Sequence, residues 1–248
     1  MREDFTHAAR RRALLRASIG VLLLGTLRTA AFAQGARAAK MKIGVIGSGR
    51  HGGAIGSLWI KAGHQVLFSS RHPDELKDLV AGLGPLARAG LPEEAATFGD
   101  AILIAVPYGA LPQVGRDLAP ALKGKVVLDA CNAIASRDGP IADEARANGI
   151  GITSQRYLPG TRLVRAFNSM GSRILAAQAN RPDPKMAIPI AGDDADALKV
   201  AADLVRDAGF DPVIVGPLAR ATEFAMGAPG YGQQVTAPEL RQKLSIAP

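Results

Sequence analysis

The stretch MKIGVIGSGRHGG, residues 41–53, joins a short apolar run to three glycines, Gly47, Gly49 and Gly52. The glycines form the pattern G-x-G-x-x-G after a predicted strand and at the start of a predicted helix. In such a turn Gly47 would permit the tight bend, Gly49 would let the backbone approach a pyrophosphate, and Gly52 would let helix and strand pack closely. Free N–H groups at the helix start then attract the anion. The alternative is a turn that needs glycine for geometry alone, but the context favours a dinucleotide site.

Apolar runs of strand length alternate with segments of helical periodicity along the rest of the chain. The predicted strands are 42–46, 65–70, 101–106, 125–130, 163–167, 186–191 and 212–216, with a weak strand near 86–89. The predicted helices are 53–62, 73–81, 92–97, 111–122, 141–147 and 194–208. Continuous apolar strands are typical of a sheet buried on both faces. The sequence therefore predicts an α/β fold, a Rossmann-type, doubly wound and mostly parallel sheet over residues 41–221, with a short C-terminal tail, residues 222–248.

The first forty residues have a different character. Three arginines at 10–12 precede an apolar run at 17–27, and Ala-Phe-Ala at 31–33 offers a cleavage site. This pattern is typical of an export signal, and its RRALLR segment is similar to the twin-arginine form. A membrane anchor or a basic amphipathic helix is the alternative, but eleven apolar residues are too few to cross a hydrocarbon core of roughly 30 Å.

We therefore expect residues 1–33 to form a twin-arginine-like signal peptide and residues 34–40 to form a linker. The expected partner is the twin-arginine export machinery, and the expected location of the cleaved protein is the periplasm or another extracytoplasmic compartment. Because six arginines, one Glu and one Asp lie in the signal segment, half of the formal net charge of +8 belongs to it.

The composition argues against several classes of function. Basic residues are scattered among acids and aromatics are only 4% of the chain, so a nucleic-acid groove is not expected. The single cysteine, Cys131, cannot form an internal disulfide. The sequence also offers no Ser-His-Asp order and no cluster of metal ligands. We predict neither a catalytic side chain nor a metal site, so the cofactor would supply the chemistry.

The residues after the second predicted strand distinguish NAD from NADP. An NAD site places Asp or Glu there, about 20 residues beyond the glycines, to bind the ribose 2′-hydroxyl. This chain has Ser70 and Arg71 instead. Hydroxyl and guanidinium groups donate hydrogen bonds to a 2′-phosphate, whereas a carboxylate would repel it. The position outweighs the ordinary interpretation of Arg71 as a solvated surface residue, and the sequence predicts NADP(H).

Further candidates lie at the glycine turn itself. The Ser48 hydroxyl is a second candidate phosphate ligand. Arg50 and His51 would face either the pyrophosphate or the nicotinamide, with exposed positions at the helix start as the alternative.

Later strand ends supply the remaining candidates, because ligands of open α/β sheets bind outside the carboxyl ends of the strands. The AVPY segment would place Ala105, Val106 and Pro107 beside the nicotinamide, with the Tyr108 ring as a wall for the substrate. Asn132 and Asn168 can donate and accept, which suits a carboxamide or a substrate carbonyl, although asparagine also caps helices.

The motifs IGSGRHG, SSRHP, AVPY, LVRAFNSMG and DAGFDPVIVGPLARA together resemble the NADP oxidoreductases dependent on coenzyme F-420, a deazaflavin. The reductase domain of the six-transmembrane epithelial antigen ferric reductases is a relative. The similarity runs from Met41 to about Ala221, and it departs at Arg165, where the family usually has Lys, at residues 131–133 and after Ala221. The resemblance implies direct hydride transfer between NADPH and a stacked flavin or deazaflavin. It assigns phosphate contacts to the glycine turn and Ser48, 2′-phosphate contacts to Ser70 and Arg71, and nicotinamide contacts to Ala105, Val106, Pro107 and Phe167-Asn168.

The sequence thus predicts an NADP-dependent oxidoreductase whose partner is a small-molecule hydride acceptor: a flavin, a deazaflavin (coenzyme F-420) or a similar two-electron acceptor. The alternative is a non-catalytic NADP-binding protein that senses or carries the nucleotide. A hydroxyacid or 6-phosphogluconate type dehydrogenase would need a long helical domain, for which the 32 residues after Gly216 leave no room. The residues leave the oligomeric state open, a homo-oligomer included.

Overall fold

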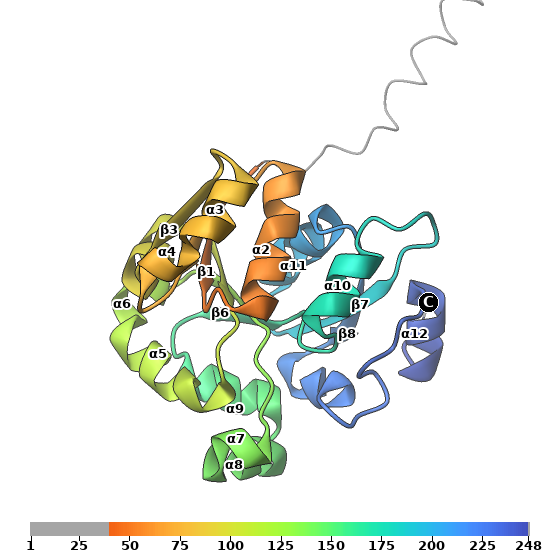
Figure 1. Cartoon of the computed structure of the whole chain (residues 1–248). Helices are drawn as coiled ribbons and strands as arrows, with labels where there is room; N and C mark the ends of the chain where they lie inside the picture. Colours follow the sequence, from red (N-terminus) through yellow and green to blue (C-terminus); the bar gives the residue numbers. More distant parts are fainter. Residues whose placement is uncertain (1–39, 248) are drawn as a thin grey trace, which may run out of the picture. The chain divides into compact units, whose positions relative to one another are not determined.

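The computed structural model describes residues 40–247, so the predicted signal segment and most of the predicted linker lie outside the described residues. The described residues form an eight-stranded sheet with helices on both faces (Figure 1). The strands are β1 (Lys42–Ile46), β2 (Gln65–Ser69), β3 (Ala87–Gly90), β4 (Ala101–Ile104), β5 (Val126–Asp129), β6 (Arg162–Arg165), β7 (Ala187–Gly192) and β8 (Asp211–Gly216).

The order of the strands across the sheet is β3-β2-β1-β4-β5-β6-β7-β8. All neighbouring strands pair in parallel except β6 and β7, which are antiparallel. The order reverses between β1 and β4, and open sheets of this type bind ligands at that reversal, beyond the carboxyl ends of the strands. The predicted Rossmann-type, mostly parallel fold is confirmed, and so is the weak strand near residues 86–89.

Helices cover both faces because the central strands β1, β4, β5 and β7 have buried residues on both of their sides. One face packs against α2 (Arg50–Ala62), the 3-10 turn η1 (Pro73–Leu76), α3 (Lys77–Leu83), α10 (Ser172–Gln178) and α11 (Ala195–Asp207). The other packs against α4 (Pro92–Phe98), η2 (Tyr108–Ala110), α5 (Leu111–Asp117), α6 (Ala119–Leu122), α8 (Pro140–Asn148), α9 (Ile150–Tyr157), η3 (Leu218–Phe224) and α12 (Ala237–Lys243). The short helix α7 (Ala135–Asp138) connects β5 to α8.

The residues after Ala221 pack against the sheet rather than away from it. Phe224 and Leu240 are fully buried in the same apolar cluster as the strands. The carbonyl of Val235 accepts a hydrogen bond from the Ala187 N–H at 2.8 Å, at the start of β7. Residues from Lys40 onward therefore form one compact unit.

Several helices differ from the sequence prediction. The predicted helix 111–122 is divided into α5 and α6 at Leu118, because Pro120 has no N–H to bond back to the preceding turn. The helices α7, α9 and α10 were not predicted. In α9 the buried face includes Thr153 and Ser154, so the apolar periodicity that marks a helix is absent. No helix within residues 40–247 combines the length and the apolar character that a membrane span requires.

Candidate nucleotide-binding site

A cavity of about 570 Å³ lies at the carboxyl ends of β1, β2 and β4, and we call it the nucleotide cavity. It brings together seven of the predicted cofactor residues: Gly47, Ser48, Gly49, Ser70, Arg71, Val106 and Pro107. Ala105 is adjacent, since its carbonyl oxygen would lie 2.7 Å from a Cβ built at Gly47. These residues come from three separate strand ends that the parallel register places side by side.

The three glycines of the turn are needed for different reasons. Gly47 has a φ of +93°, which favours glycine. A Cβ on Gly52 would lie 2.2 Å from the Gly47 carbonyl oxygen, so the close packing of α2 on the turn requires its absence. Gly49 has an ordinary φ of −68°, and a Cβ built there meets no protein atom within 4 Å. The protein itself therefore gives no packing reason for glycine at position 49, and the bare backbone suits the approach of a ligand.

The start of α2 fits an anionic group. Gly49 is the N-cap residue and supplies no side-chain cap, and the first turn of α2 contains no acidic residue. Its first N–H groups are thus available, and the helix dipole favours a negative charge there. The Ser48 hydroxyl beside them is buried and has no hydrogen-bond partner. A pyrophosphate at this position would satisfy both groups.

The outer part of the nucleotide cavity combines polar and apolar walls. Arg71 is exposed at its rim, and the Ser70 hydroxyl accepts a hydrogen bond from the His72 N–H at 3.0 Å, which holds the turn after β2. Glu75 also lines the cavity, one turn further along the chain. The apolar walls form a slot that suits a flat ring such as adenine, and they are built from Leu76, Pro92, Val114 and Leu118.

Arg50 and His51 do not line the nucleotide cavity. Arg50 is exposed at the first position of α2. The His51 Nε2 lies 3.0 Å from the Phe167 carbonyl oxygen, and since a carbonyl only accepts, this nitrogen carries the proton. Burial lowers the pKa of His51, so the ring is neutral at pH 7. His51 therefore connects α2 to the segment after β6 rather than to a phosphate.

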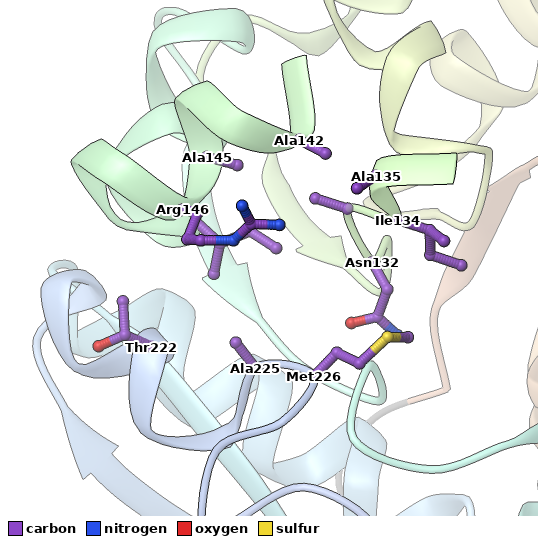
Figure 2. Close-up of a pocket in the computed structure, with 11 residues that line it drawn as sticks. Asn132, Ile134, Ala135, Ala142, Ala145, Arg146, Thr222, Ala225 and Met226 are labelled. Carbon is purple, nitrogen blue, oxygen red and sulfur yellow. The ribbon is translucent and has the colours of Figure 1, made fainter. Parts of the chain in front are cut away.

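A smaller cavity of about 350 Å³, the second cavity, lies beyond the carboxyl end of β5 (Figure 2). Of the predicted site residues only Asn132 lines it. The others were not identified from the sequence, because they come from the segment after β5, from α7, α8 and α9, and from η3 with the two residues after it, and form no motif: Ala133, Ile134, Ala135, Ala142, Ala145, Arg146, Ile150, Thr222, Ala225 and Met226.

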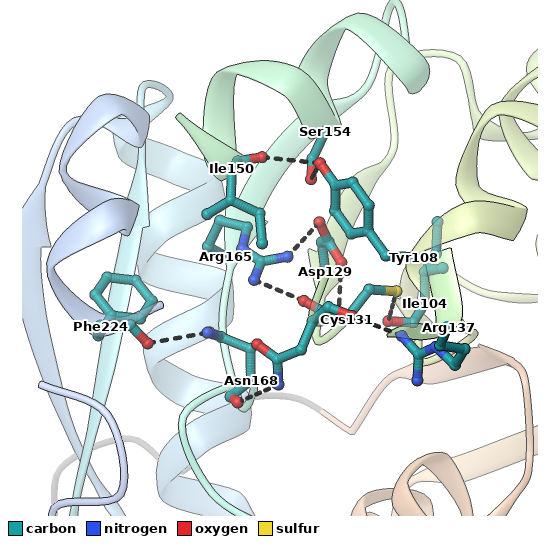
Figure 3. Close-up of polar contacts among 11 residues, drawn as sticks. Ile104, Tyr108, Asp129, Cys131, Arg137, Ile150, Ser154, Arg165, Asn168 and Phe224 are labelled. Carbon is teal, nitrogen blue, oxygen red and sulfur yellow. Dashed lines mark hydrogen bonds and ion pairs between the residues drawn. The ribbon is translucent and has the colours of Figure 1, made fainter. Parts of the chain in front are cut away.

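Hydrogen bonds bring the two predicted asparagines together (Figure 3). The Asn132 Nδ2 donates to the Asn168 carbonyl at 2.7 Å, and the Asn168 Nδ2 donates to the Phe224 carbonyl at 3.1 Å. Both side-chain oxygens are buried without a partner. Each amide is thus oriented by its nitrogen and presents a free acceptor.

A buried ion pair stabilises the segment after β5 that carries Asn132. The Arg165 Nη1 lies 2.6 Å from the Asp129 Oδ2, and both side chains are completely buried. Arg165 also donates to the Cys131 carbonyl at 2.7 Å, while Asp129 accepts from the Cys131 N–H at 2.9 Å. The pair therefore fixes the segment that carries Asn132. Burial raises the pKa of the Cys131 thiol well above its usual value, so the thiol is neutral.

Tyr108 does not occupy the predicted position. Its side chain is completely buried, and its hydroxyl lies 3.2 Å from the Ser154 hydroxyl and 3.3 Å from the Ile150 carbonyl. The turn η2 directs the ring toward α9, so the ring lines neither cavity and the prediction of a substrate wall is wrong. Within residues 40–247 no three His, Cys, Asp or Glu side chains gather in a metal-binding arrangement.

Comparison with known proteins finds a family model and relatives to which this chain is similar. Residues 42–133 match the model of the family described as "NADP oxidoreductase coenzyme F420-dependent". The metalloreductase STEAP3 of Rattus norvegicus is 30% identical over 186 residues, which are 73% of this chain and 35% of that protein. The chain thus spans about a third of the length of this curated relative.

Solved structures have the same fold. A hypothetical protein from Sinorhizobium meliloti has a TM-score of 0.67 and 25% identity, over 81% of this chain and 97% of its own. A candidate F420-dependent NADP reductase from an Arthrobacter species has a TM-score of 0.62 and 22% identity, over 73% of this chain and 87% of its own. The predicted resemblance to the coenzyme F420-dependent NADP oxidoreductases is thus confirmed over residues 42–133, the segment that carries the glycine turn and the residues after β2, β4 and β5.

Proposed function

We propose that this protein is an NADP-dependent oxidoreductase that transfers a hydride between NADP(H) and a flavin, a deazaflavin such as coenzyme F-420, or a closely similar ring. The observation that carries the proposal is the set of side chains around the two cavities. Neither cavity is lined by a His, Lys, Cys or Tyr side chain. The carboxylates of the nucleotide cavity, Glu75 and Asp117, are exposed at its outer part.

The lack of a placed base limits the class of substrate. An alcohol or a hydroxyacid needs a general base within hydrogen-bond reach to take its hydroxyl proton. A flavin or deazaflavin takes a hydride on the ring and exchanges its other proton with water. NADP(H), when bound, supplies the hydride.

The chain's own residues hold and orient the nucleotide in this proposal. The N–H groups at the start of α2 and the Ser48 hydroxyl bind the pyrophosphate, and Ser70 and Arg71 bind the 2′-phosphate. Val106 and Pro107 border the nicotinamide. The free side-chain oxygens of Asn132 and Asn168 lie at the next strand ends and accept from the N–H groups of a carboxamide or an acceptor ring.

The experiment that tests the proposal follows NADPH absorbance with a panel of acceptors: flavins, a deazaflavin and simple carbonyl compounds. We expect turnover with the ring acceptors and little with the carbonyl compounds. Turnover restricted to carbonyl compounds would refute the proposal. Saturable NADPH binding without any turnover would favour a nucleotide sensor or carrier instead.

Arg71→Ala is expected to weaken NADP+ binding by about ten- to a hundredfold, because a hydrogen bond to a charged group contributes roughly 1.5–3 kcal/mol. Titration calorimetry at low salt measures the change, since Arg71 is exposed and salt screens it. NAD+ lacks the 2′-phosphate and should bind the variant as it binds the wild type. Lys61→Ala removes an equal charge at the far end of α2 and should have no effect. Equal losses for both nucleotides would mean that Arg71 does not read the phosphate.

A further inference from the structure

The second cavity adjoins the nucleotide cavity at the same edge of the sheet. The Ala130 N–H bonds to the Ile104 carbonyl at 3.0 Å, so the ends of β4 and β5 lie side by side. Two residues further on, Val106 faces the nucleotide cavity and Asn132 faces the second cavity. Neighbouring strands are about 4.8 Å apart, so a ring in the second cavity can lie against a nicotinamide beside Val106.

We propose that the second cavity is the acceptor site and that it recognises the imide edge of the acceptor ring, an N–H flanked by two carbonyls. Asn132 Oδ1 accepts from the ring N–H, and the Arg146 guanidinium donates to a ring carbonyl. This inference rests on the proposed function and extends it, because it makes Asn132 and Arg146 residues that determine acceptor specificity.

The orientation of the Asn132 amide is the first observation behind the proposal. Its Nδ2 donates to the Asn168 carbonyl, and a reversed amide would place two acceptors together, so the oxygen must face away from Asn168. That oxygen is buried and has no partner in the protein. Figure 2 shows it pointing into the second cavity. A ligand that enters the cavity must therefore offer an N–H or leave a buried acceptor unpaired.

Arg146 is the second observation, because it is the one charged side chain among the residues that line the second cavity. It lies on α8 and pairs with Asp143 through Nη1 at 3.0 Å. Its guanidinium group points toward the cavity in Figure 2, from a different wall of the cavity than Asn132. A guanidinium only donates, so it complements the carbonyl groups that flank an imide N–H.

The remaining walls determine the shape of the ligand. They are formed mainly by alanines, with Ile134, Ile150 and Met226, and the volume of about 350 Å³ is close to the lower limit of small-molecule sites. This space suits one flat ring system and not a second dinucleotide. Flavins and deazaflavins carry the imide edge, whereas quinones and simple carbonyl compounds lack its N–H. In the reaction the ring gains a hydride, which is one hydrogen with two electrons, from NADPH, and it gains one proton from water. The bonds of the imide edge do not change.

Lumiflavin and its N3-methyl derivative test the contact with Asn132 without any change to the protein. Methylation removes the imide N–H, so the unpaired Asn132 oxygen should reduce kcat/KM for NADPH oxidation by about ten- to a hundredfold. The rates are divided by those of the uncatalysed reactions with NADPH. Equal values for the two flavins would overturn the assignment of Asn132.

Arg146→Ala tests the second contact. We expect KM for lumiflavin to rise by about five- to twentyfold, with little change in kcat, because Arg146 is largely exposed and binds the ring away from the reacting atoms. Arg206→Ala is the matched control, since Arg206 forms an equivalent exposed i,i+3 pair with Asp203 on α11 and lines neither cavity. Equal KM values for the two variants would overturn the role of Arg146.

Ala225→Leu tests whether the acceptor occupies the second cavity at all, because a larger side chain on this partly exposed wall fills it. Lumiflavin turnover should be lost while the Kd for NADP+ stays within about twofold. Unchanged turnover would place the acceptor elsewhere. If the wild type binds NADP+ but none of the acceptors supports NADPH oxidation, the proposed function fails together with this inference. If turnover is the same with the methylated flavin and in the Arg146→Ala and Ala225→Leu variants, the inference alone is refuted.

Discussion

Gly52→Ala is expected to weaken NADP(H) binding by more than about a hundredfold. The new methyl group would lie 2.2 Å from the Gly47 carbonyl oxygen and 3.0 Å from a Val45 methyl carbon. A backbone carbonyl in the turn cannot rotate away as a flexible side chain can, so the first turn of α2 must move off β1. That movement displaces the N–H groups that we propose to bind the pyrophosphate, and overpacking of this kind also costs typically about 1–3 kcal/mol of stability.

Gly53→Ala is the matched control for this prediction. It introduces the same methyl group one residue later in the same helix, where the nearest atom is the Ser48 carbonyl oxygen at 3.5 Å, an ordinary contact. Alanine favours a helix over glycine by up to about 1 kcal/mol, so this variant should be at least as stable as the wild type and should bind NADP+ normally. Calorimetric Kd values for both variants, with thermal unfolding curves, make the comparison. Similar affinities for the two variants would contradict the role given to Gly52.

Arg165→Met is expected to lower the free energy of unfolding by about 3–5 kcal/mol, because it leaves the completely buried Asp129 carboxylate without its counter-charge. This is a large part of the roughly 5–15 kcal/mol that stabilises an ordinary domain. The variant also loses the hydrogen bond to the Cys131 carbonyl, which positions Asn132. Urea unfolding measures the change.

Two further variants separate charge from packing at Arg165. Asp129→Leu combined with Arg165→Met removes both charges and should recover most of the lost stability, since the penalty comes from the unpaired carboxylate. Arg165→Lys keeps the charge and should be milder than Arg165→Met. If the double variant is as unstable as Arg165→Met, the loss comes from packing and the assignment to a buried ion pair is wrong.

The residues around the nucleotide cavity could be predicted from the sequence because the patterns that indicate them are local. Gly47, Gly49 and Gly52 lie within six residues, and the apolar strands show their burial directly. The residues after β1, β2 and β4 were predicted together, since parallel strands end at one edge of the sheet. The structure added the reason for each glycine, above all that Gly49 is not required by the protein's own packing.

The residues around the second cavity could not be predicted from the sequence, because the cavity depends on contacts between distant segments. Arg146 and Met226 are 80 residues apart, and both line the second cavity because η3 packs against α9, which in turn packs against α8. The Tyr108 ring was expected at the site because AVPY ends a strand, but its orientation depends on the buried hydroxyl of Ser154, 46 residues later. The helix α9 was not predicted because its buried face is partly polar: Ser154, on that face, contacts the Tyr108 hydroxyl, which comes from a distant part of the chain.

The most direct test of hydride transfer uses NADPH with two deuterium atoms at C4 of the nicotinamide and a deazaflavin as acceptor. The hydrogen gained at the ring carbon of a deazaflavin does not exchange with water, so mass spectrometry of the reduced product reports its origin. Direct hydride transfer predicts one deuterium in the reduced deazaflavin and one left in the NADP+. Reduced deazaflavin that carries only hydrogen from water, or NADPH that stays unoxidised in the presence of the acceptor, would contradict it.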